Sequence, residues 1–352
     1  MNKKSISCVD LFCGAGGLTH GLIKSGIKVN VGIDLDPTCR YPFEENNPGA
    51  KFIERNIEKF TSKEIDNYFE KKSISLLAGC APCQPFSTYS HRYDNKRDGK
   101  WELLNHFTRI VKGIEPEIVT MENVPALIRH DVFHNFVNTL KRRGYHVWYD
   151  VVDCNLYGVP QTRKRTVLLA SKFGPISMIK KTHKKPRTVR QTIGKLPPIG
   201  AGEFDPKDRL HKCQGLTEIN MKRIKASNPG GTWRDWPKHI RTKCHQKSTG
   251  KTFPSVYGRM EWDKVGPTMT TQCFGYGNGR FGHPEQDRAI TLREAAMLQS
   301  FPKKYKFVEK GQPIEFVNIG RLIGNAVPVK LGEAIGKSIK QHVNEYFESK
   351  AH

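Results

Sequence analysis

The sequence of 352 residues lacks several features that would assign it to a common class of protein. It contains no run of eighteen apolar residues, so no segment has the composition of a transmembrane helix. The N-terminal residues lead straight into a strand pattern, without the apolar core of a signal peptide. The nine cysteines are odd in number and scattered, which does not fit a disulfide framework. We therefore expect reduced thiols, a cytoplasmic location and no association with a membrane.

Acidic residues are scarce relative to basic ones. The chain has 34 Asp and Glu against 58 Lys and Arg, for a formal net charge of +24. The excess is concentrated between residues 180 and 250, where 18 basic residues stand against 5 acidic ones, with Trp233 and Trp236 interleaved. Basic segments with aromatic residues are typical of proteins that contact a phosphate backbone. This pattern favours a nucleic-acid partner over a merely solvated basic surface.

Strand and helix patterns alternate over the first 175 residues, which predicts a largely parallel, doubly wound α/β sheet. The predicted strands are 6–12, 29–33, 74–78, 118–121, 147–152 and 166–170, and the predicted helices are 18–24, 37–46, 65–69, 103–112 and 132–141. Prolines and basic turns then dominate before two more helices, 291–298 and 332–347. We predict a large α/β domain over 1–178, a smaller basic domain over 179–287, and a C-terminal segment, 288–352, that packs back on the large domain.

A glycine-rich turn, from Phe12 to Gly17, follows the first predicted strand and precedes the first helix. Glycines at this place let the backbone approach a ligand closely. The turn has neither the Gly-x-Gly-x-x-Gly pattern nor a Walker motif. Asp34 ends the second predicted strand, where its carboxylate can accept hydrogen bonds from ribose hydroxyls. The pair suggests a nucleoside-bearing cofactor, and a tight packing turn beside a solvated Asp34 remains the alternative.

Residues 79–87, with the sequence GCAPCQPFS, follow a short buried strand. Pro82 fixes its own φ and restricts Ala81, so Cys83 is held on a stiff loop at the edge of the sheet. A thiol in this place is a candidate nucleophile. The spacing of Cys80 and Cys83 also fits a redox pair or half of a metal site, and lone cysteines are often only buried apolar residues.

Two further polar groups lie near the ends of predicted strands. Glu122 ends the strand that follows the one leading to Cys83, so we expect both side chains at the same edge of the sheet. Glu122 can there hydrogen-bond a ring nitrogen of a substrate, or it can simply begin a helix. Arg163 and Arg165 precede a strand, and their alternation predicts one cationic cluster on one face. Such a cluster can hold an acceptor oxygen or phosphate, or can only protect an edge strand.

The order and spacing of these segments resemble the DNA cytosine-5 methyltransferase family. Residues 293–302, REAAMLQSFP, and residues 324–328, GNAVP, add two further matches. The resemblance runs from about Val9 to Lys340, with a gap in the basic region. It implies a Rossmann-like sheet of the S-adenosylmethionine-dependent methyltransferases with a smaller, basic target-recognition domain. It also implies an enzyme that methylates C5 of a flipped-out cytosine in a specific double-stranded DNA sequence.

The resemblance assigns a role to each motif. Cys83 matches the nucleophile, Glu122 the carboxyl that contacts the cytosine N3 edge, and Arg163 and Arg165 the arginines of the catalytic pocket. The positions that match S-adenosylmethionine contacts are Phe12, Cys13, Gly14, Ala15, Gly16, Gly17, Asp34, Leu35, Asn56, Ile57, Pro82, Leu103, Asn325 and Ala326. At Asn56 the family usually has Asp. Cys80 has no role in the family pattern and is interpreted as incidental, and no metal is expected.

Three other classes of protein share parts of this pattern. An RNA cytosine-5 methyltransferase would share the chemistry, but the large basic region favours duplex DNA. A silent DNA-binding subunit would not need Cys83, Glu122 and Arg165, all of which are present. A thioredoxin-like enzyme would need neither the cofactor turn nor the basic charge. The resemblance further implies a monomer and a cognate restriction endonuclease acting on the same site. The segment 87–100, with five basic or histidine residues, is expected to close over the DNA.

Overall fold

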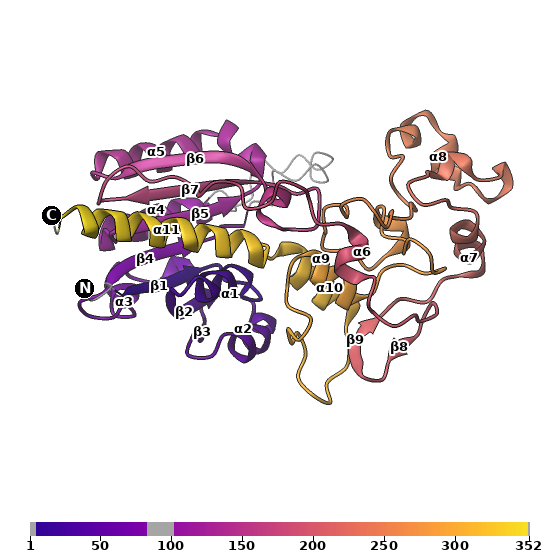
Figure 1. The fold of residues 1–352 in the computed structure, drawn as a ribbon, viewed down its shortest axis with the longest axis horizontal. Helices are drawn as coiled ribbons and strands as arrows, with labels where there is room; N and C mark the ends of the chain where they lie inside the picture. The colour runs from indigo at the N-terminus through magenta and orange to yellow at the C-terminus, as the bar shows by residue number, and fades with distance from the viewer. Residues whose placement is uncertain (1–4, 83–101, 351–352) are drawn as a thin grey trace. The chain divides into compact units, whose positions relative to one another are not determined.

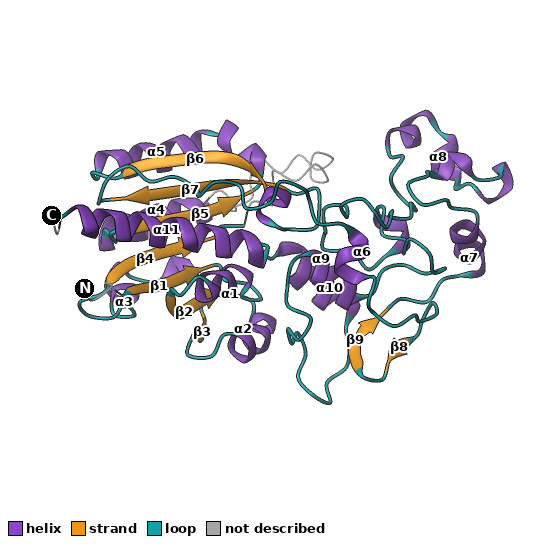
Figure 2. Cartoon of the chain, in the orientation of Figure 1, coloured by secondary structure: helices purple, strands orange, loops and turns teal. Residues whose placement is uncertain are grey.

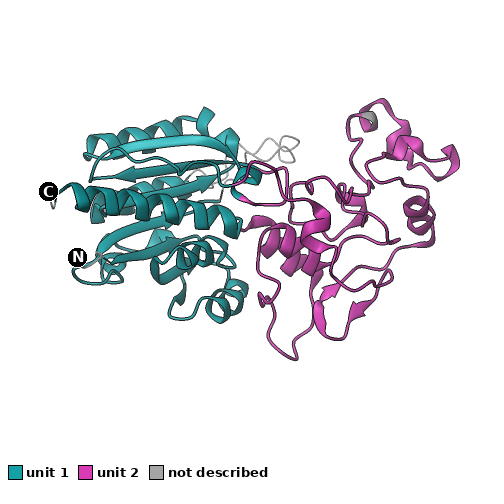
Figure 3. Ribbon diagram, in the orientation of Figure 1, with its two compact units in different colours: residues 1–157, 164–182, 327–352 teal, residues 158–163, 183–326 magenta. Residues whose placement is uncertain are grey.

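The computed structural model describes residues 5–82 and 102–350. The chain forms two compact units (Figure 3). Unit 1 comprises residues 1–157, 164–182 and 327–352, and unit 2 comprises residues 158–163 and 183–326. The C-terminal segment, 288–352, is thus divided between them at residue 327. The predicted functional boundaries at 178 and 287 stay predictions.

Unit 1 is built on a seven-stranded sheet with the strand order β3-β2-β1-β4-β5-β7-β6 (Figures 1 and 2). Its strands are β1 (Ile6–Leu11), β2 (Lys28–Asp34), β3 (Lys51–Glu54), β4 (Ile74–Gly79), β5 (Ile118–Asn123), β6 (His146–Asp153) and β7 (Lys164–Ser171). The strand pairs β1–β2, β2–β3, β1–β4 and β4–β5 are parallel, whereas β7 is antiparallel to both β5 and β6. The strand order reverses at β1, between β2 and β4. In open α/β sheets, ligands bind beyond the carboxyl ends of the strands at such a point.

Helices cover both faces of this sheet. On one face, apolar residues of β1 and β2 pack with Phe107 and Phe136 of α4 (Glu102–Ile114) and α5 (Asp131–Arg142). Helices α1 (Gly17–Lys24) and α11 (Val329–Ser349) lie side by side across the sheet in Figure 1. A Cβ at Gly21 would come within 2.5 Å of the α11 backbone, so these two helices need glycine there to approach. The shorter helices of unit 1 are α2 (Arg40–Asn46) and α3 (Ser62–Asp66).

Unit 2 contains short helices and one two-stranded hairpin. The hairpin is β8 (Phe204–Asp205) and β9 (Asp208–Lys212), and the helices are α6 (Val189–Ile193), α7 (Glu218–Lys225), α8 (Lys243–Gln246), α9 (Leu292–Leu298) and α10 (Phe316–Asn325). Arg288 donates two hydrogen bonds of 2.8 Å to Glu294 in its interior. Both side chains are fully buried, so each compensates the charge of the other.

The tryptophans of the basic region form a core of unit 2 and are not surface rings. Trp233 and Trp236 are buried and pack with Ile224, Ile240 and Tyr276. These rings therefore do not lie on a surface that could contact phosphates, and they supply instead the apolar burial that this loop-rich segment needs. The segment also carries exposed basic side chains, which include Lys222, Lys225, Arg234, Lys238, Lys243 and Lys247.

Most predicted elements of unit 1 are confirmed, with differences at several places. The α-helix predicted over 37–46 begins at Arg40, after a 3-10 turn at Pro37–Cys39. Strand β3 was not predicted. Helix α3 begins at Ser62 and not at residue 65, because Thr61 and Glu64 form a capping box that starts the helix there. The sheet is mixed, since β7 runs against its neighbours. Among the described residues, no helix combines the length and apolar composition needed to cross a membrane.

Candidate active site

The glycine-rich turn between β1 and α1 takes a conformation that few residues other than glycine accept. Gly14 and Gly16 have φ values of 52° and 84°, and Phe12 has a φ of 58°. The turn is tied to β2 by a hydrogen bond of 3.2 Å from Cys13 N to Ile33 O. Left-handed backbone at three positions brings the main chain around before α1 begins at Gly17. The predicted cofactor turn thus lies beyond the carboxyl end of β1, where the strand order reverses.

Asp34, the last residue of β2, joins this turn. Its Oδ2 accepts a hydrogen bond of 2.9 Å from Gly14 N, and its Oδ1 accepts one of 3.0 Å from Asp36 N. Burial raises the pKa of Asp34, and these backbone donors act in the opposite direction. A carboxylate oxygen has two lone pairs, so each can accept another donor. The next residue, Leu35, is 63% exposed, and thus places an apolar side chain beside these acceptors.

Three other predicted cofactor residues occupy two neighbouring segments of unit 1. Asn56 accepts a hydrogen bond of 3.0 Å from Glu58 N and so caps the 3-10 turn Ile57–Lys59. Ile57 is buried in the core, and Leu103, in the first turn of α4, packs against the same core. Both ends of the Asn56 amide therefore interact with Glu58, since Nδ2 also donates a hydrogen bond of 3.3 Å to Glu58 Oε2.

Asp10 was not among the predicted site residues, although it lies in β1 just before the turn. It is fully buried, and Thr19 Oγ1 donates a hydrogen bond of 2.6 Å to its Oδ2. Among the described residues its Oδ1 has no hydrogen-bond partner. Burial raises the pKa of Asp10 to about 7. A carboxyl group beneath the turn is therefore partly protonated at neutral pH.

We expect this carboxyl to make the free energy of unfolding fall between about pH 4 and 7. In the unfolded chain an aspartate titrates near about 3.9, whereas in the folded chain Asp10 titrates at about 7. Between these two pKa values the folded state holds a proton that the unfolded state has lost, so the free energy of unfolding falls as the pH rises. Above pH 7 the loss, relative to pH below 4, amounts to about 4 kcal/mol. Asp10→Asn cannot ionise and keeps an acceptor for Thr19. Urea unfolding at pH 5 and pH 8 should therefore show a flatter pH dependence for Asp10→Asn, and equal dependences would contradict this assignment.

Glu122 lies near the carboxyl end of β5 and is 2% exposed. Strands β4 and β5 are parallel, with Gly79 opposite Met121, so Cys80 comes next to Glu122. The Cys80 thiol donates a hydrogen bond of 3.0 Å to Glu122 Oε2. Interpreting Cys80 as incidental missed this contact, because it depends on the register of two strands that are distant in sequence.

Arg165 approaches the same carboxylate from β7. Since β7 is antiparallel to β5, its first residues lie at the carboxyl end of β5, where Glu122 is. Arg165 Nε is 3.0 Å from Glu122 Oε1, and both side chains are largely buried. The N–H does not point at the oxygen, and Oε1 has no hydrogen-bond partner within 5–82 and 102–350. The site thus holds a buried carboxylate oxygen, neutralised by a cation, with unused acceptor capacity.

The backbone on both sides of this carboxylate is also fixed. Asn123, which follows Glu122, donates a hydrogen bond of 2.9 Å from Nδ2 to Ala81 O. Cys80 N donates to Leu11 O at 3.2 Å, so the chain after β4 stays attached to β1. Asn123 was not among the predicted site residues. It holds the segment that ends at Pro82, the last described residue before Cys83.

The structure places the remaining predicted site residues elsewhere or leaves them undescribed. Arg163 precedes β7 and belongs to unit 2, so the strand alternation with Arg165 does not apply to it. Its guanidinium donates to Met269 O at 3.0 Å and to Gly324 O at 3.3 Å. Asn325 and Ala326 also belong to unit 2, and their roles stay predictions. Cys83 and the segment 87–100 lie outside the described residues.

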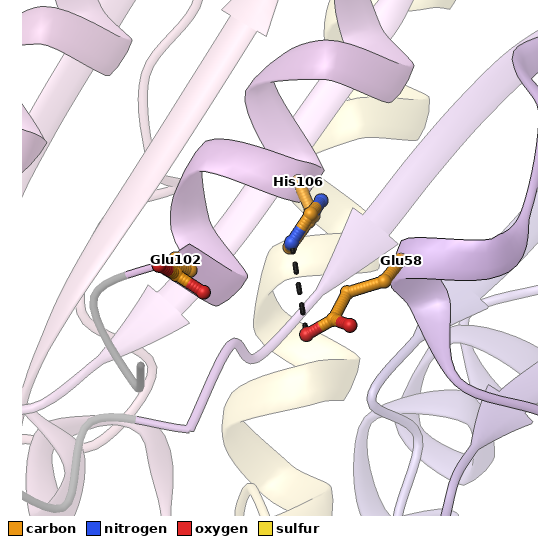
Figure 4. A group of neighbouring side chains, drawn as sticks. All are labelled: Glu58, Glu102 and His106. Carbon is orange, nitrogen blue, oxygen red and sulfur yellow. Dashed lines mark ion pairs between the residues drawn. The ribbon is translucent and has the colours of Figure 1, made fainter. Parts of the chain in front are cut away.

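One further group of polar side chains gathers near the start of α4. Glu58, Glu102 and His106 bring their ligand atoms within 4.8 Å of one another, and His106 Nε2 is 3.8 Å from Glu58 Oε1 (Figure 4). Both glutamates are exposed and His106 is half-buried. Exposed acidic groups beside a histidine are common on protein surfaces without an ion, and the expected absence of a metal stays a prediction.

Comparisons with known proteins identify the class of enzyme to which this chain belongs. The chain belongs to the C-5 cytosine-specific DNA methylase family, whose model matches residues 6–341. It is therefore a DNA (cytosine-5-)-methyltransferase, and the predicted α/β fold of these enzymes is confirmed.

Individual relatives place the chain among the type II methylases. It is 50% identical over 345 residues to the type II methylase M.HgiDII of Herpetosiphon aurantiacus, covering 97% of this chain and 96% of that protein. The type II methyltransferase M.Sau96I of Staphylococcus aureus is 29% identical, over 98% of this chain and 78% of its own. The crystal structure of a Spodoptera frugiperda DNMT2 variant has a similar fold, with a TM-score of 0.66 and 18% identity, covering 97% of this chain and all of that one.

Proposed function

We propose that this enzyme transfers a methyl group to C5 of a flipped-out cytosine in a specific duplex DNA sequence, through a covalent bond between Cys83 and C6. The observation that carries the proposal is the buried Glu122 carboxylate beside Arg165, with an oxygen that has no hydrogen-bond partner among the described residues. A buried acceptor without a partner is costly unless a ligand satisfies it. The N3 and amino edge of cytosine provides a complementary ligand.

The methyl donor of the family, S-adenosylmethionine, fits the turn beyond β1 and β2. Asp34 keeps a lone pair on each carboxylate oxygen for the ribose hydroxyls, and Leu35 offers an exposed apolar surface for the adenine. Gly14 and Gly16 have no side chains, so a ligand can approach the backbone of the turn closely at these positions. When bound, the cofactor supplies an electrophilic methyl group on a sulfonium. Cys13, Ala15, Gly17, Asn56, Ile57, Pro82, Leu103, Asn325 and Ala326 stay proposed contacts on the resemblance.

The residues of the chain activate the base. C5 of cytosine is too electron-poor to take a methyl group unaided, so Cys83 Sγ adds to C6 while Glu122 supplies a proton or a strong hydrogen bond at N3. C5 then carries the electron pair that forms the new carbon–carbon bond, while the bond between the methyl carbon and the donor's sulfur breaks and its electron pair stays on that sulfur. Loss of the C5 proton to a base finally breaks the bond between Sγ and C6 and releases the thiolate. Arg165, whose guanidinium lies beside Glu122, is proposed to favour the negative charge needed in the pocket, and a role for Arg163 there rests on the resemblance alone.

Duplex DNA is proposed as the partner because the target carbon must leave the base stack and because unit 2 carries exposed basic residues. Extrusion of a base costs a few kcal/mol, which contacts to the DNA backbone must offset. We propose that part of unit 2 is the target-recognition domain, in which bidentate side-chain contacts read bases in the major groove. A cytoplasmic, monomeric enzyme paired with a restriction endonuclease of the same specificity completes the proposal.

Phosphate contacts predict a steep dependence of DNA affinity on salt. If unit 2 makes six to ten such contacts, the affinity should fall by about 10³ to 10⁵ between 50 and 200 mM salt. Lys243→Gln with Lys247→Gln should reduce the slope of log affinity against log salt by about 2, because each lysine neutralises about one phosphate. The matched control is Lys51→Gln with Lys71→Gln, two exposed lysines of unit 1. A flat dependence of the affinity on salt, measured by fluorescence anisotropy, would contradict the proposed phosphate contacts of unit 2.

Bisulfite sequencing of DNA from cells that express the chain tests the proposed reaction. We expect protected cytosines within one short sequence and none outside it. Incubation of the purified protein with a tritiated methyl donor and either duplex DNA or transfer RNA decides between the two substrates. Label in RNA alone would favour the RNA methyltransferase, and label in neither would favour the silent DNA-binding subunit.

A further inference from the structure

We propose that Cys80 is a positioning residue for Glu122, and that its thiol fixes the rotation of the carboxyl group that serves the cytosine. The inference rests on the proposed function, since it needs Glu122 to act on the base. Cys80 lies one residue beyond β4, and its half-buried side chain reaches the Glu122 carboxylate on the neighbouring strand.

The two oxygens of Glu122 have different surroundings. Oε2 accepts the hydrogen bond of 3.0 Å from Cys80, whereas Oε1 is 3.0 Å from Arg165 Nε without hydrogen-bond geometry. The torsion that turns a carboxyl group is broad, so a charge beside one oxygen does not by itself fix its plane. The hydrogen bond from Cys80 is directional and fixes the plane of the carboxyl group, because it holds Oε2 in one position. Cys80 therefore determines where Oε1 points.

The position of Cys80 is itself well determined. Its backbone N–H donates to Leu11 O at 3.2 Å, and Ala81 O accepts from Asn123 at 2.9 Å. These bonds attach the segment after β4 to β1 on one side and to β5 on the other. The thiol is thus held between strands, and it is a more rigid donor than a side chain on a free loop would be.

A thiol is a weak donor, and this allows a sharp test. A hydroxyl is a stronger donor than a thiol, and this offsets its shorter reach toward Glu122, so serine should replace Cys80 with little loss. Alanine removes the donor and leaves Glu122 free to rotate. A hydrogen bond to a charged group typically changes an equilibrium by about tenfold to a hundredfold, and a weak donor belongs at the lower end.

The experiment measures the single-turnover rate of methyl transfer, the Kd for DNA and the KM for S-adenosylmethionine. Cys80→Ala should lower the transfer rate about tenfold and leave both binding constants within about twofold. Cys80→Ser should stay within about threefold of the wild type. Cys154→Ala, which removes a buried thiol just beyond β6, serves as the matched control for loss of a cysteine from unit 1.

Glu122→Gln and the double variant with Cys80→Ala separate this inference from the proposed function. If Cys80 acts through Glu122, then Cys80→Ala should slow Glu122→Gln by no more than about twofold. A tenfold loss that persists in that background would overturn the inference, as would a Cys80→Ser variant no faster than Cys80→Ala. A Cys80→Ala variant with wild-type rate would do the same. If Glu122→Gln itself keeps the wild-type rate, then the proposed function fails, whatever the Cys80 variants show.

Discussion

Cys83→Ser should abolish methyl transfer, with a loss of at least about 10⁴-fold in the single-turnover rate. A thiol with a pKa of about 8.5 is a few per cent thiolate at neutral pH, whereas a serine hydroxyl stays protonated without a strong base beside it. C5 of the target cytosine then gains no electron density, and the donor's methyl group has no nucleophile to accept it. Binding of S-adenosylmethionine should change by less than about twofold, because Asp34 and the glycine-rich turn are untouched.

Cys80→Ser is the matched control for this loss. It makes the same chemical change three residues earlier in the chain, and the hydroxyl can still donate to Glu122. We therefore expect an active Cys80→Ser enzyme and an inactive Cys83→Ser enzyme. The reverse result in a tritiated-methyl assay would assign the nucleophile to Cys80 and overturn the mechanism.

Glu122→Gln should be the second most damaging substitution, with a loss of about 10³-fold in the transfer rate. Glutamine keeps the shape of the side chain and an acceptor for Cys80, but it cannot hand a proton to N3 of the cytosine. Addition of the thiolate to C6 then builds up negative charge on the ring without relief. The KM for S-adenosylmethionine should stay within about twofold, because Glu122 lies on β5 and the predicted cofactor contacts lie on other segments.

The matched control is Glu117→Gln, just before the other end of the same strand. Glu117 accepts a hydrogen bond of 2.8 Å from Ser75 N, which the amide oxygen of glutamine can still accept. Near-normal transfer by Glu117→Gln together with near-normal transfer by Glu122→Gln would show that N3 needs no carboxyl group. Equal losses in both would indicate damage to β5 and not to the chemistry.

The parts of the site that follow strongly from local sequence could be predicted. The turn from Phe12 to Gly17 comes directly after a buried strand, and its glycines carry the positive φ values that the turn needs. Asp34 and Glu122 each lie at or near the carboxyl end of a strand, where parallel sheets bring ligands together. Local pattern and sheet topology agree at these positions, so no knowledge of distant contacts was needed.

Other features depend on contacts between distant segments and could not be read from local pattern. Strand β3 has four residues, of which only Phe52 is fully buried, so it gives almost no periodic signal. The antiparallel direction of β7 brings Arg165 to Glu122, and nothing in the sequence near Arg165 encodes that direction. The bond from Cys80 to Glu122 requires the order and register of β4 and β5.

The burial of Trp233 and Trp236 was missed for a similar reason. The surrounding lysines and arginines suggested a solvent-facing surface, but a segment with few regular elements still needs an apolar core to fold. The two rings supply it together with Ile224, Ile240 and Tyr276. The Thr-x-x-Asp spacing of Thr232 and Asp235 does indicate local order in this segment, because the two residues form a capping box that fixes the 3-10 turn Trp233–Asp235.

The covalent bond between Cys83 and the target base is the central claim, and duplex DNA with 5-fluorocytosine at the target position tests it most directly. Fluorine at C5 cannot leave as a proton does, so the final elimination stops and the enzyme stays attached to the methylated base. Mass spectrometry of the digested complex should find the modified nucleotide on the peptide that contains both cysteines, and fragmentation should place it on Cys83. Attachment at Cys80, or methyl transfer to ordinary cytosine with no complex formed on the fluorinated duplex, would contradict the mechanism.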